Sequence, residues 1–260
     1  MLDIENITVA YHGQPFLRDF SLHMKRGEII SLVGESGSGK TTAIRSILGL
    51  LPQEGELVSG DILFEGKSLP EYSEKEMQKL RGSRISMIFQ DSGAMLNPIR
   101  KIGSQYIEYI QKHEKLGHKA AEEKAVAMLE AMRLSEPERI MKSYSFQLSG
   151  GMRQRVGIAM AMTFEPELLL ADEPTAALDV TTQAQIVREM MELRDRFGTG
   201  IIIVTHNLGV AAYMADQLIV MQHGKVVDRG TRDEVMDHPT SEYTRNLLQS
   251  VPELEGRRFV

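Results

Sequence analysis

Apolar positions along the chain repeat with two periods, and these predict strands that alternate with helices. Apolar residues that alternate or run continuously predict strands at residues 2–10, 28–33, 60–65, 84–89, 168–171, 200–205 and 217–221. Apolar residues at intervals of three and four predict helices at residues 42–50, 73–80, 149–162, 181–197 and 207–214, and a longer helical region between residues 100 and 133. The segments 218–222 and 225–228 flank His223-Gly224, which is typical of a two-residue hairpin turn. The alternation favours a mostly parallel sheet covered by helices on both faces.

The composition is that of an ordinary globular protein. Of 260 residues, 42% are hydrophobic and 25% are charged, which is enough apolar material for a sizeable core. No run approaches the ~20 consecutive apolar residues of a membrane-spanning helix, and the first residues lack the pattern of a signal peptide, so we expect a cytoplasmic chain. The absence of cysteine excludes disulfides and cysteine-ligated metals. A net charge of −6 argues against a surface for duplex nucleic acid.

A glycine-rich segment lies between the predicted strand at 28–33 and the predicted helix at 42–50. It fits the pattern G-x-x-x-x-G-K-[ST] with Gly34, Glu35, Ser36, Gly37, Ser38, Gly39, Lys40 and Thr41. Glycines let such a loop bend until its N–H groups converge on the phosphate oxygens of a nucleotide, and the positive end of the next helix adds to the attraction. We expect Lys40 to add a point charge, Thr41 to bind Mg²⁺ through its hydroxyl, and the ATP site to extend to Thr42.

Two carboxylates follow the apolar strand at 168–171. Asp172 and Glu173 face opposite ways, because successive strand residues do, so we expect different roles for them. The carboxyl end of a parallel strand faces the ligand crevice. Asp172 is therefore expected to reach Mg²⁺ through water, and Glu173 to act as the general base near the γ-phosphate. Taken alone, a strand that ends in Asp-Glu is usually the start of a solvated loop.

Two further polar residues stand at predicted strand ends. His206 follows the strand at 200–205, where an imidazole can hydrogen-bond the γ-phosphate. Gln90 follows the strand at 84–89, where its amide oxygen can complete a magnesium shell. In isolation each would be an ordinary residue, and only the phosphate loop favours these roles.

A third segment resembles a family signature. Residues 148–155 read Leu-Ser-Gly-Gly-Met-Arg-Gln-Arg and resemble the signature of the ATP-binding cassette (ABC) ATPases. Ser149, Gly150 and Gly151 at a helix N-terminus form a second anion-binding surface, which has no lysine. The resemblance implies that this surface covers ATP held by the phosphate loop of a second subunit. It also implies an α/β fold: a P-loop NTPase (RecA-like) core with a parallel sheet, an antiparallel β subdomain and an inserted α-helical signature subdomain.

The resemblance covers nearly the whole chain and implies further roles. Tyr11 matches the aromatic residue that stacks on adenine, Asp179 lies in the loop 177–179 that crosses the dimer seam, and His206 matches the switch histidine. Met152 stands where many members have glutamine, and Asn207 where aspartate is commoner. Neither change removes a reacting group, so we expect hydrolysis of ATP with Mg²⁺.

The same resemblance implies a division of the chain into subdomains. The nucleotide-binding core with its β subdomain is expected at residues 1–92 and 163–235, the helical signature subdomain at 93–162, and a tail at 236–260.

Several segments resemble one branch, the importers for peptides and nickel. They are Phe89-Gln90-Asp91, Leu96-Asn97-Pro98, residues 150–155, His238-Pro239, Tyr243-Thr244 and Leu247-Leu248. Many peptide-importing relatives end in a cysteine-rich segment that holds an iron–sulfur cluster. Its absence here slightly favours nickel or a metallophore as the cargo.

The resemblance implies a peripheral protein on the cytoplasmic face of the membrane. Its expected partners are a second, related but different ATPase subunit, two membrane permease subunits and, indirectly, an extracytoplasmic solute-binding protein; nucleic acid is not expected. Met95, Leu96 and Ile99 are candidates for docking a permease helix, although they also fit an ordinary core.

Two alternatives stay open at this point. A non-transport ABC ATPase would normally show a long coiled-coil insertion or two cassettes in tandem, and the chain has neither pattern. A regulatory nucleotide-binding subunit would be expected to lack Glu173 or His206. The residues do not decide the cargo, the direction of transport, the choice between homodimer and heterodimer, or a regulatory role of the tail.

Overall fold

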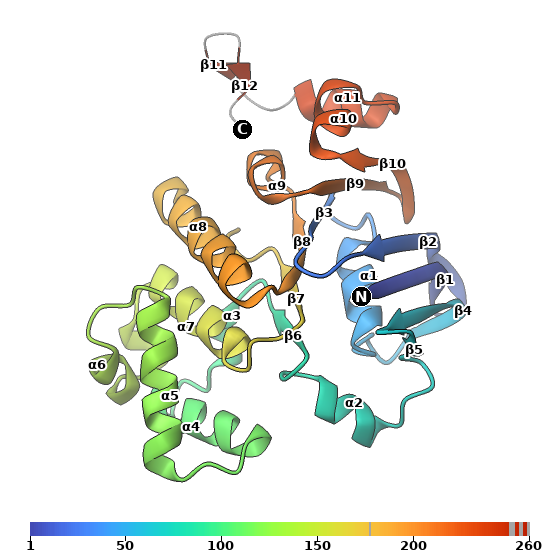
Figure 1. Cartoon of the computed structure of the whole chain (residues 1–260). Coiled ribbons are helices and arrows are strands. Elements are labelled where there is room, and N and C mark those ends of the chain that lie inside the picture. The colour runs from blue at the N-terminus through green and yellow to red at the C-terminus, as the bar shows by residue number, and fades with distance from the viewer. Residues whose placement is uncertain (177, 250–252, 255–256, 259–260) are drawn as a thin grey trace. The chain divides into compact units, whose positions relative to one another are not determined.

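The computed structural model describes residues 1–176, 178–249, 253–254 and 257–258. These residues form two compact units (Figure 1). The first comprises Met1–Gln78 and Gly200–Val260, and the second comprises Lys79–Thr199. The second unit is therefore inserted in sequence between the two segments of the first.

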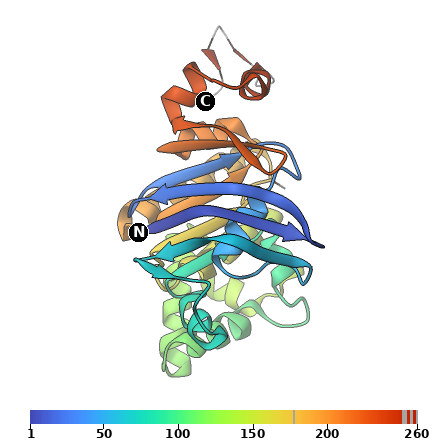
Figure 2. The same ribbon diagram turned by 90° about the vertical axis from the view of Figure 1, so that its right-hand side faces the viewer.

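The first unit contains an antiparallel sheet in the order β2-β1-β4-β5 (Figure 2). Its strands are β1 (Leu2–Tyr11), β2 (Gln14–Met24), β4 (Gly55–Phe64) and β5 (Lys67–Ser68). Ile7 pairs with Phe20, and the register shifts on both sides of this pair. Asn6 and Asp19 have positive φ angles of 47° and 49°, as expected where bulges interrupt the strands.

A second set of strands in this unit surrounds β3. The strands are β3 (Ile29–Val33), β8 (Gly200–Thr205), β9 (Gln217–Gln222) and β10 (Lys225–Thr231). The strand β3 is parallel to both β8 and β9, and β10 is antiparallel to β9. Every residue of β3 and β8 is buried, as in a sheet covered on both faces. The predicted hairpin is confirmed: His223 and Gly224 both have positive φ, 49° and 76°, as a type I′ turn requires.

Among the described residues, five helices belong wholly or mainly to the first unit. They are α1 (Lys40–Ile47), α2 (Glu74–Leu80), α9 (Leu208–Met214), α10 (Arg232–Asp237) and α11 (Glu242–Gln249). Val33, at the end of β3, belongs to an apolar cluster with Leu208, Val235 and Leu248 from α9, α10 and α11. Burial of this cluster fixes the C-terminal helices beside the end of β3. The short strands β11 (Glu253–Leu254) and β12 (Arg257–Arg258) pair antiparallel.

The second unit is mainly helical. Its two parallel strands are β6 (Ile85–Ile88) and β7 (Leu168–Asp172). Its helices are α3 (Ser92–Met95), α4 (Ile102–His113), α5 (His118–Ala131), α6 (Pro137–Lys142), the 3₁₀ helix η1 (Ser145–Gln147), α7 (Gly150–Met162) and α8 (Val180–Phe197). Helix α5 packs against α4, α6 and α7, and α7 also contacts β6 and α8. An ion pair between Arg155 and Glu189, at 2.9 Å, joins α7 to α8.

Most of the predicted strands and helices are confirmed within a few residues, but β2 was missed. Leu17 and Phe20 are both buried although they are three residues apart, because the bulge at Asp19 interrupts the alternation that a strand normally shows. Helix α10, which begins before the expected tail, and helix α11, which lies within it, were also not predicted. The expected subdomain boundaries at residues 93 and 162 remain predictions.

In the described part of the chain, no helix has both the length and the apolar character needed to cross a membrane.

Candidate active site

The phosphate loop joins β3 to α1 in the first unit. Gly34, Gly37 and Gly39 have φ angles of 144°, 80° and 104°, which side chains with a Cβ rarely adopt. A Cβ on Gly34 would lie 2.2 Å from the carbonyl oxygen of Met221, so backbone approach as well as φ requires glycine there. Gly39 is the N-cap of α1, and the first turn of α1 contains no acidic residue. The positive end of the helix therefore faces the loop without a competing carboxylate.

Lys40 lies inside this loop rather than extended into solvent. Its ammonium group donates hydrogen bonds of 2.7 Å to the carbonyl oxygens of Gly34 and Glu35, and one of 3.3 Å to Ser38 Oγ. The side chain is only 6% exposed. The loop thus forms a concave backbone segment with a buried cation at its base, which is the arrangement that binds phosphate groups.

The hairpin between β9 and β10 contacts the phosphate loop through a backbone hydrogen bond. The N–H of Gly224 donates to the carbonyl oxygen of Ser38 at 3.1 Å, and the N–H of Arg18 donates to the carbonyl of Gly224 at 2.9 Å. A Cβ on Gly224 would lie 1.7 Å from the carbonyl oxygen of Phe16. Sequence reasoning identified this hairpin but not its contact with the phosphate loop.

The predicted adenine-stacking residue lies at the end of β1. The Tyr11 hydroxyl is 3.1 Å from Thr42 Oγ1 on α1, and its ring packs edge-on against Phe16 with a centroid distance of 5.4 Å. Phe16 is 37% exposed. Tyr11 is therefore held beside the helix that follows the phosphate loop, and a second aromatic ring lies next to it.

His206 directly follows β8, at the sheet edge where the phosphate loop follows β3. Val33 of β3 pairs in parallel with Thr205 of β8, so Gly34 and His206 are the next residues on neighbouring strands. His206 is exposed, and Asn207 caps α9 by accepting a 3.2 Å hydrogen bond from the N–H of Val210. The first unit therefore brings together the loop, Tyr11 and His206.

The second unit shows the same arrangement at the ends of β6 and β7. Ile88 pairs in parallel with Ala171, so the residues that follow these two lie at the same edge of the strand pair. Asp172 is the last residue of β7 and is 4% exposed, whereas Glu173 is partly exposed. Glu173 has a positive φ of 49°, which turns the backbone sharply after Asp172. The exposed Gln90 lies two residues after β6, at this same edge.

The segment that resembles the ABC signature begins α7, as predicted. Ser149 is the N-cap, and its Oγ accepts a 3.3 Å hydrogen bond from the N–H of Met152. Gly150 and Gly151 form the first turn, and a Cβ on Gly151 would lie 2.8 Å from Thr182 Cγ2 of α8. Glycine at this position therefore lets the start of α7 approach α8 closely.

Asp179, in the segment before α8, is the N-cap of that helix. Its carboxylate accepts hydrogen bonds from the N–H of Thr182 at 3.0 Å and from the Thr182 hydroxyl at 2.7 Å. These bonds lower the pKa of Asp179 below its usual value. Of the predicted dimer-seam loop, Ala177 lies outside the described residues.

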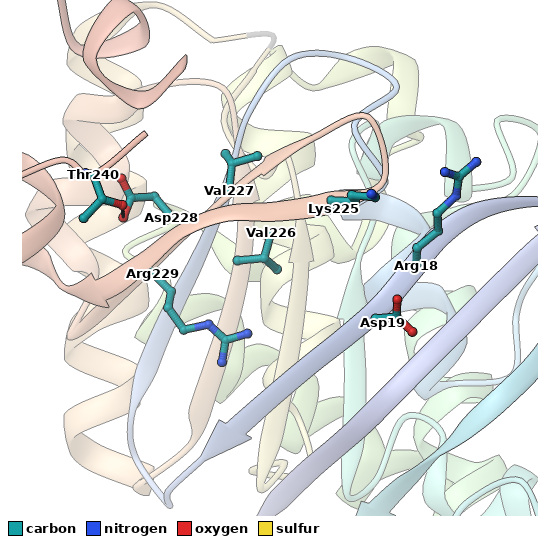
Figure 3. A pocket seen from close by; sticks show the side chains of 8 residues that line it. All are labelled: Arg18, Asp19, Lys225, Val226, Val227, Asp228, Arg229 and Thr240. Carbon is teal, nitrogen blue, oxygen red and sulfur yellow. Dashed lines mark hydrogen bonds between the residues drawn. The ribbon is translucent and has the colours of Figure 1, made fainter. Parts of the chain in front are cut away.

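A separate hollow of about 510 Å³ lies in the first unit between β2 and β10 (Figure 3). It is lined by Arg18, Asp19, Lys225, Val226, Val227, Asp228, Arg229 and Thr240. None of the residues predicted to bind ATP lines it, so this hollow is distinct from the phosphate loop.

The fold and the phosphate loop define a P-loop ATPase, and the comparisons with known proteins identify its family. The family model for ABC transporters matches residues 17–176. A probable peptide ABC transporter ATP-binding protein of Sinorhizobium fredii is 44% identical over 97% of this chain and 77% of the relative. The oligopeptide transport ATP-binding protein OppD of Bacillus subtilis is 46% identical over 98% of this chain and 73% of the relative. The chain belongs to the ABC transporter family.

Solved structures of ATP-binding cassettes share the fold. The ADP- and phosphate-bound dimer of the cassette MJ0796 aligns with a TM-score of 0.79 at 27% identity, over 89% of this chain and 99% of that chain. CbiO1 from Clostridium perfringens, part of an ABC transporter complex, aligns with the same TM-score at 30% identity, over 91% of this chain and 90% of that chain. The predicted family and α/β fold class are thereby confirmed.

Proposed function

We propose that this chain is the ATP-hydrolysing subunit of an ABC importer for peptides. The observation that supports ATP binding best is the phosphate loop, with Lys40 held on the carbonyls of Gly34 and Glu35 and the dipole of α1 directed at the same place. The peptide cargo follows the names of the relatives, which include oligopeptide and dipeptide transport proteins of Bacillus subtilis. Nickel or a metallophore is the competing cargo.

Each predicted residue has a role in hydrolysis under this proposal. Glu173 orients water and accepts its proton as the water attacks the γ-phosphate in line. Lys40 and His206 donate hydrogen bonds to phosphate oxygens, which stabilises the negative charge that spreads over them. Tyr11 stacks on the adenine ring.

Residues with oxygen donors are proposed to hold magnesium. The Thr41 hydroxyl, the Asp172 carboxylate and the Gln90 amide oxygen are hard ligands of the kind that Mg²⁺ prefers, and Mg²⁺ usually keeps several waters and uses only one or two carboxylates. When bound, Mg²⁺ would neutralise charge on the β- and γ-phosphates. Thr41 lies in the first turn of α1, next to Lys40.

The surface formed by Ser149, Gly150 and Gly151, called the signature surface here, is proposed to bind a second ATPase subunit. Ser149 is exposed at the N-terminus of α7, and Asp179 is exposed at the N-terminus of α8. Val180, beside Asp179, is 81% exposed although it is apolar. Two helix N-termini and an exposed apolar residue suit a surface that closes over the phosphates of a partner's ATP.

Membrane coupling is proposed at the surface beyond Gln90. Met95 and Ile99 are 62% and 83% exposed, so they are not core residues, and they lie close in sequence to Gln90. Leu96, the third predicted docking residue, is only 4% exposed and is a core residue, so that part of the prediction is wrong. Exposed apolar side chains of this kind suit docking of a permease helix. The chain would then work as a peripheral protein on the cytoplasmic face of the membrane.

Vesicles that contain this chain with its two permease subunits and solute-binding protein test the proposal. We expect ATP-dependent uptake of a labelled oligopeptide and none of free or chelated nickel. Uptake of nickel alone would replace the cargo and leave the importer role. ATP hydrolysis without uptake of either would overturn the transport proposal while leaving the ATPase assignment in place.

A further inference from the structure

A tyrosine from the C-terminal helix contacts the phosphate loop. The N–H of Glu35, the second residue of the loop, donates a 2.9 Å hydrogen bond to the hydroxyl oxygen of Tyr243 on α11. The two residues are 208 positions apart in sequence and both belong to the first unit. Neither the loop motif nor the role of the motif residues in ATP binding requires this contact.

The peptide group between Gly34 and Glu35 is held on both sides. Its N–H, that of Glu35, is bound to Tyr243, and its carbonyl oxygen, that of Gly34, accepts a 2.7 Å hydrogen bond from Lys40 Nζ. The next peptide group is held as well, because the Glu35 carbonyl oxygen accepts 2.7 Å and 3.2 Å hydrogen bonds from Lys40 Nζ and from the N–H of Ser38. The loop therefore has one of its peptide groups fixed between the buried cation and the C-terminal helix.

A carboxylate of β10 anchors the segment that precedes α11. Asp228 is buried and accepts hydrogen bonds from the N–H and hydroxyl of Thr240, at 2.8 Å and 3.0 Å, and from the N–H of Ser241 at 3.1 Å (Figure 3 shows Asp228 beside Thr240). The Ser241 hydroxyl in turn accepts a 2.9 Å hydrogen bond from the N–H of Thr244.

Apolar packing holds the helix itself beside the loop. Leu248 is 1% exposed and belongs to the same cluster as Val33, the residue directly before Gly34, and Tyr243 packs against that cluster. The position of Tyr243 is thus set by two independent anchors, one polar and one apolar.

From these contacts we infer that Tyr243 is a positioning residue for ATP binding: its hydroxyl holds the peptide group between Gly34 and Glu35 so that the phosphate loop is already shaped for the triphosphate. The inference rests on ATP binding at this loop. Fixing a loop in its bound conformation before the ligand arrives lowers the entropy lost on binding, so the benefit falls on affinity rather than on the chemical step. Helix α11 thereby becomes a determinant of nucleotide affinity.

The substitution Tyr243→Phe tests this role because it removes the hydroxyl and keeps the ring in the apolar cluster. We expect Kd and KM for ATP to rise about 2- to 10-fold, the range of one net hydrogen bond, with kcat changed less than about 2-fold. The matched control is Tyr213→Phe, since Tyr213 lies on α9 and is 50% exposed. Equal affinities in the wild-type protein and Tyr243→Phe would overturn the inference.

Amide hydrogen exchange gives a second readout that does not depend on turnover. In the folded protein without nucleotide, we expect the Glu35 amide to exchange faster in Tyr243→Phe than in Tyr213→Phe, while the amides of β3 keep their rates. An unchanged Glu35 rate would count against the contact even if stability differed. If the wild-type protein itself bound no ATP, the proposed function would fail first, whereas normal binding with no effect of Tyr243→Phe would remove this inference alone.

Discussion

Lys40 shows how a single side chain prepares the phosphate loop. An ammonium group that is only 6% exposed needs hydrogen-bond acceptors, because burying an unpaired charge is costly. The carbonyl oxygens of Gly34 and Glu35 supply them at 2.7 Å. The loop itself therefore holds the positive charge at its base, and for Lys40 to donate to a phosphate oxygen at least one of its hydrogen bonds to Gly34, Glu35 or Ser38 must be exchanged.

Glu173→Gln tests the proposed general base. The amide keeps the size of the side chain but cannot accept the proton of the attacking water, so we expect turnover to fall about 10²- to 10⁴-fold with unchanged ATP affinity. Phosphate release and ATP titration are the measurements. Glu165→Gln is the matched control, since Glu165 is exposed and has a φ of 50° against 49° for Glu173. Full turnover in Glu173→Gln would remove the assignment.

The hairpin of β9 and β10 packs against the phosphate loop and holds its backbone in place. Its turn contacts the phosphate loop through Gly224 and Ser38, and its strand presents the Met221 carbonyl to Gly34. Both contacts use backbone atoms, so they depend on close approach of the two segments rather than on side-chain chemistry. A change in the turn should therefore affect stability and the loop together.

Gly224→Ala tests how tightly the turn is packed. The new Cβ would lie 1.7 Å from the Phe16 carbonyl oxygen at a φ of 76°, so we expect the free energy of unfolding to fall by more than about 2 kcal/mol. Gly66→Ala is the control, because Gly66 has a similar φ of 73° with open space around it, and about 1 kcal/mol is expected there. Urea denaturation measures both. Equal losses would show that backbone strain alone, and not the clash, sets the cost.

Asp228→Asn tests the anchor of the C-terminal segment through pH. Burial opposes ionisation of Asp228, but hydrogen bonds from Ser241 and Thr240 outweigh it and lower its pKa below 3.8. A carboxylate with a lowered pKa stabilises the folded state above its unfolded pKa and loses that contribution as the pH falls through the folded value. We therefore expect Asp228→Asn to cost about 1–3 kcal/mol at neutral pH and progressively less in acid.

Unfolding curves for the wild-type protein and Asp228→Asn across the acid range give this difference. Asp233→Asn is the control, since Asp233 lies on α10 in the same unit with its side chain 73% exposed. A cost that stayed constant down to the lowest pH would mean that the charge of Asp228 does not contribute.

At the scale of the whole molecule, the predicted site residues are divided between the two units. The phosphate loop, Tyr11 and His206 belong to the first, and Asp172, Glu173, Gln90, Ser149, Gly150, Gly151 and Asp179 belong to the second. The second unit interrupts the first in sequence, so neither unit contains the complete predicted set. Hydrolysis under the proposed mechanism requires both.

ATP-dependent association tests the proposed use of the signature surface. With Glu173→Gln and the companion ATPase subunit present, we expect a two-ATPase complex with ATP and separate subunits with ADP, because each triphosphate adds contacts that exist only in the closed pair. Sedimentation velocity measures the mass. Ser149→Arg should prevent the association, whereas Lys119→Glu, a change on the exposed face of α5, should not. A mass that is independent of nucleotide would overturn this part of the mechanism.

The loop motif was predictable because its chemistry is contiguous. Residues 34–41 supply the glycines, lysine and threonine in one segment, and the flanking strand and helix follow from local apolar patterns. The caps at Ser149 and Asp179 are local for the same reason, since each side chain binds an N–H three residues ahead. By contrast, β2 escaped prediction because its bulge at Asp19 breaks the period that identifies a strand.

The amino-acid sequence by itself determined the family, the α/β fold class and the residues proposed for ATP chemistry, because short contiguous motifs encode them. Only the tertiary structure decided what surrounds the phosphate loop: Tyr243 on the N–H of Glu35, Gly224 on the carbonyl of Ser38, and the Met221 carbonyl against Gly34. These contacts depend on how segments distant in sequence pack against one another, and a backbone N–H or C=O is present at nearly every residue. A hydrogen bond to a backbone group therefore does not require a particular residue type, so the sequence alone does not reveal it.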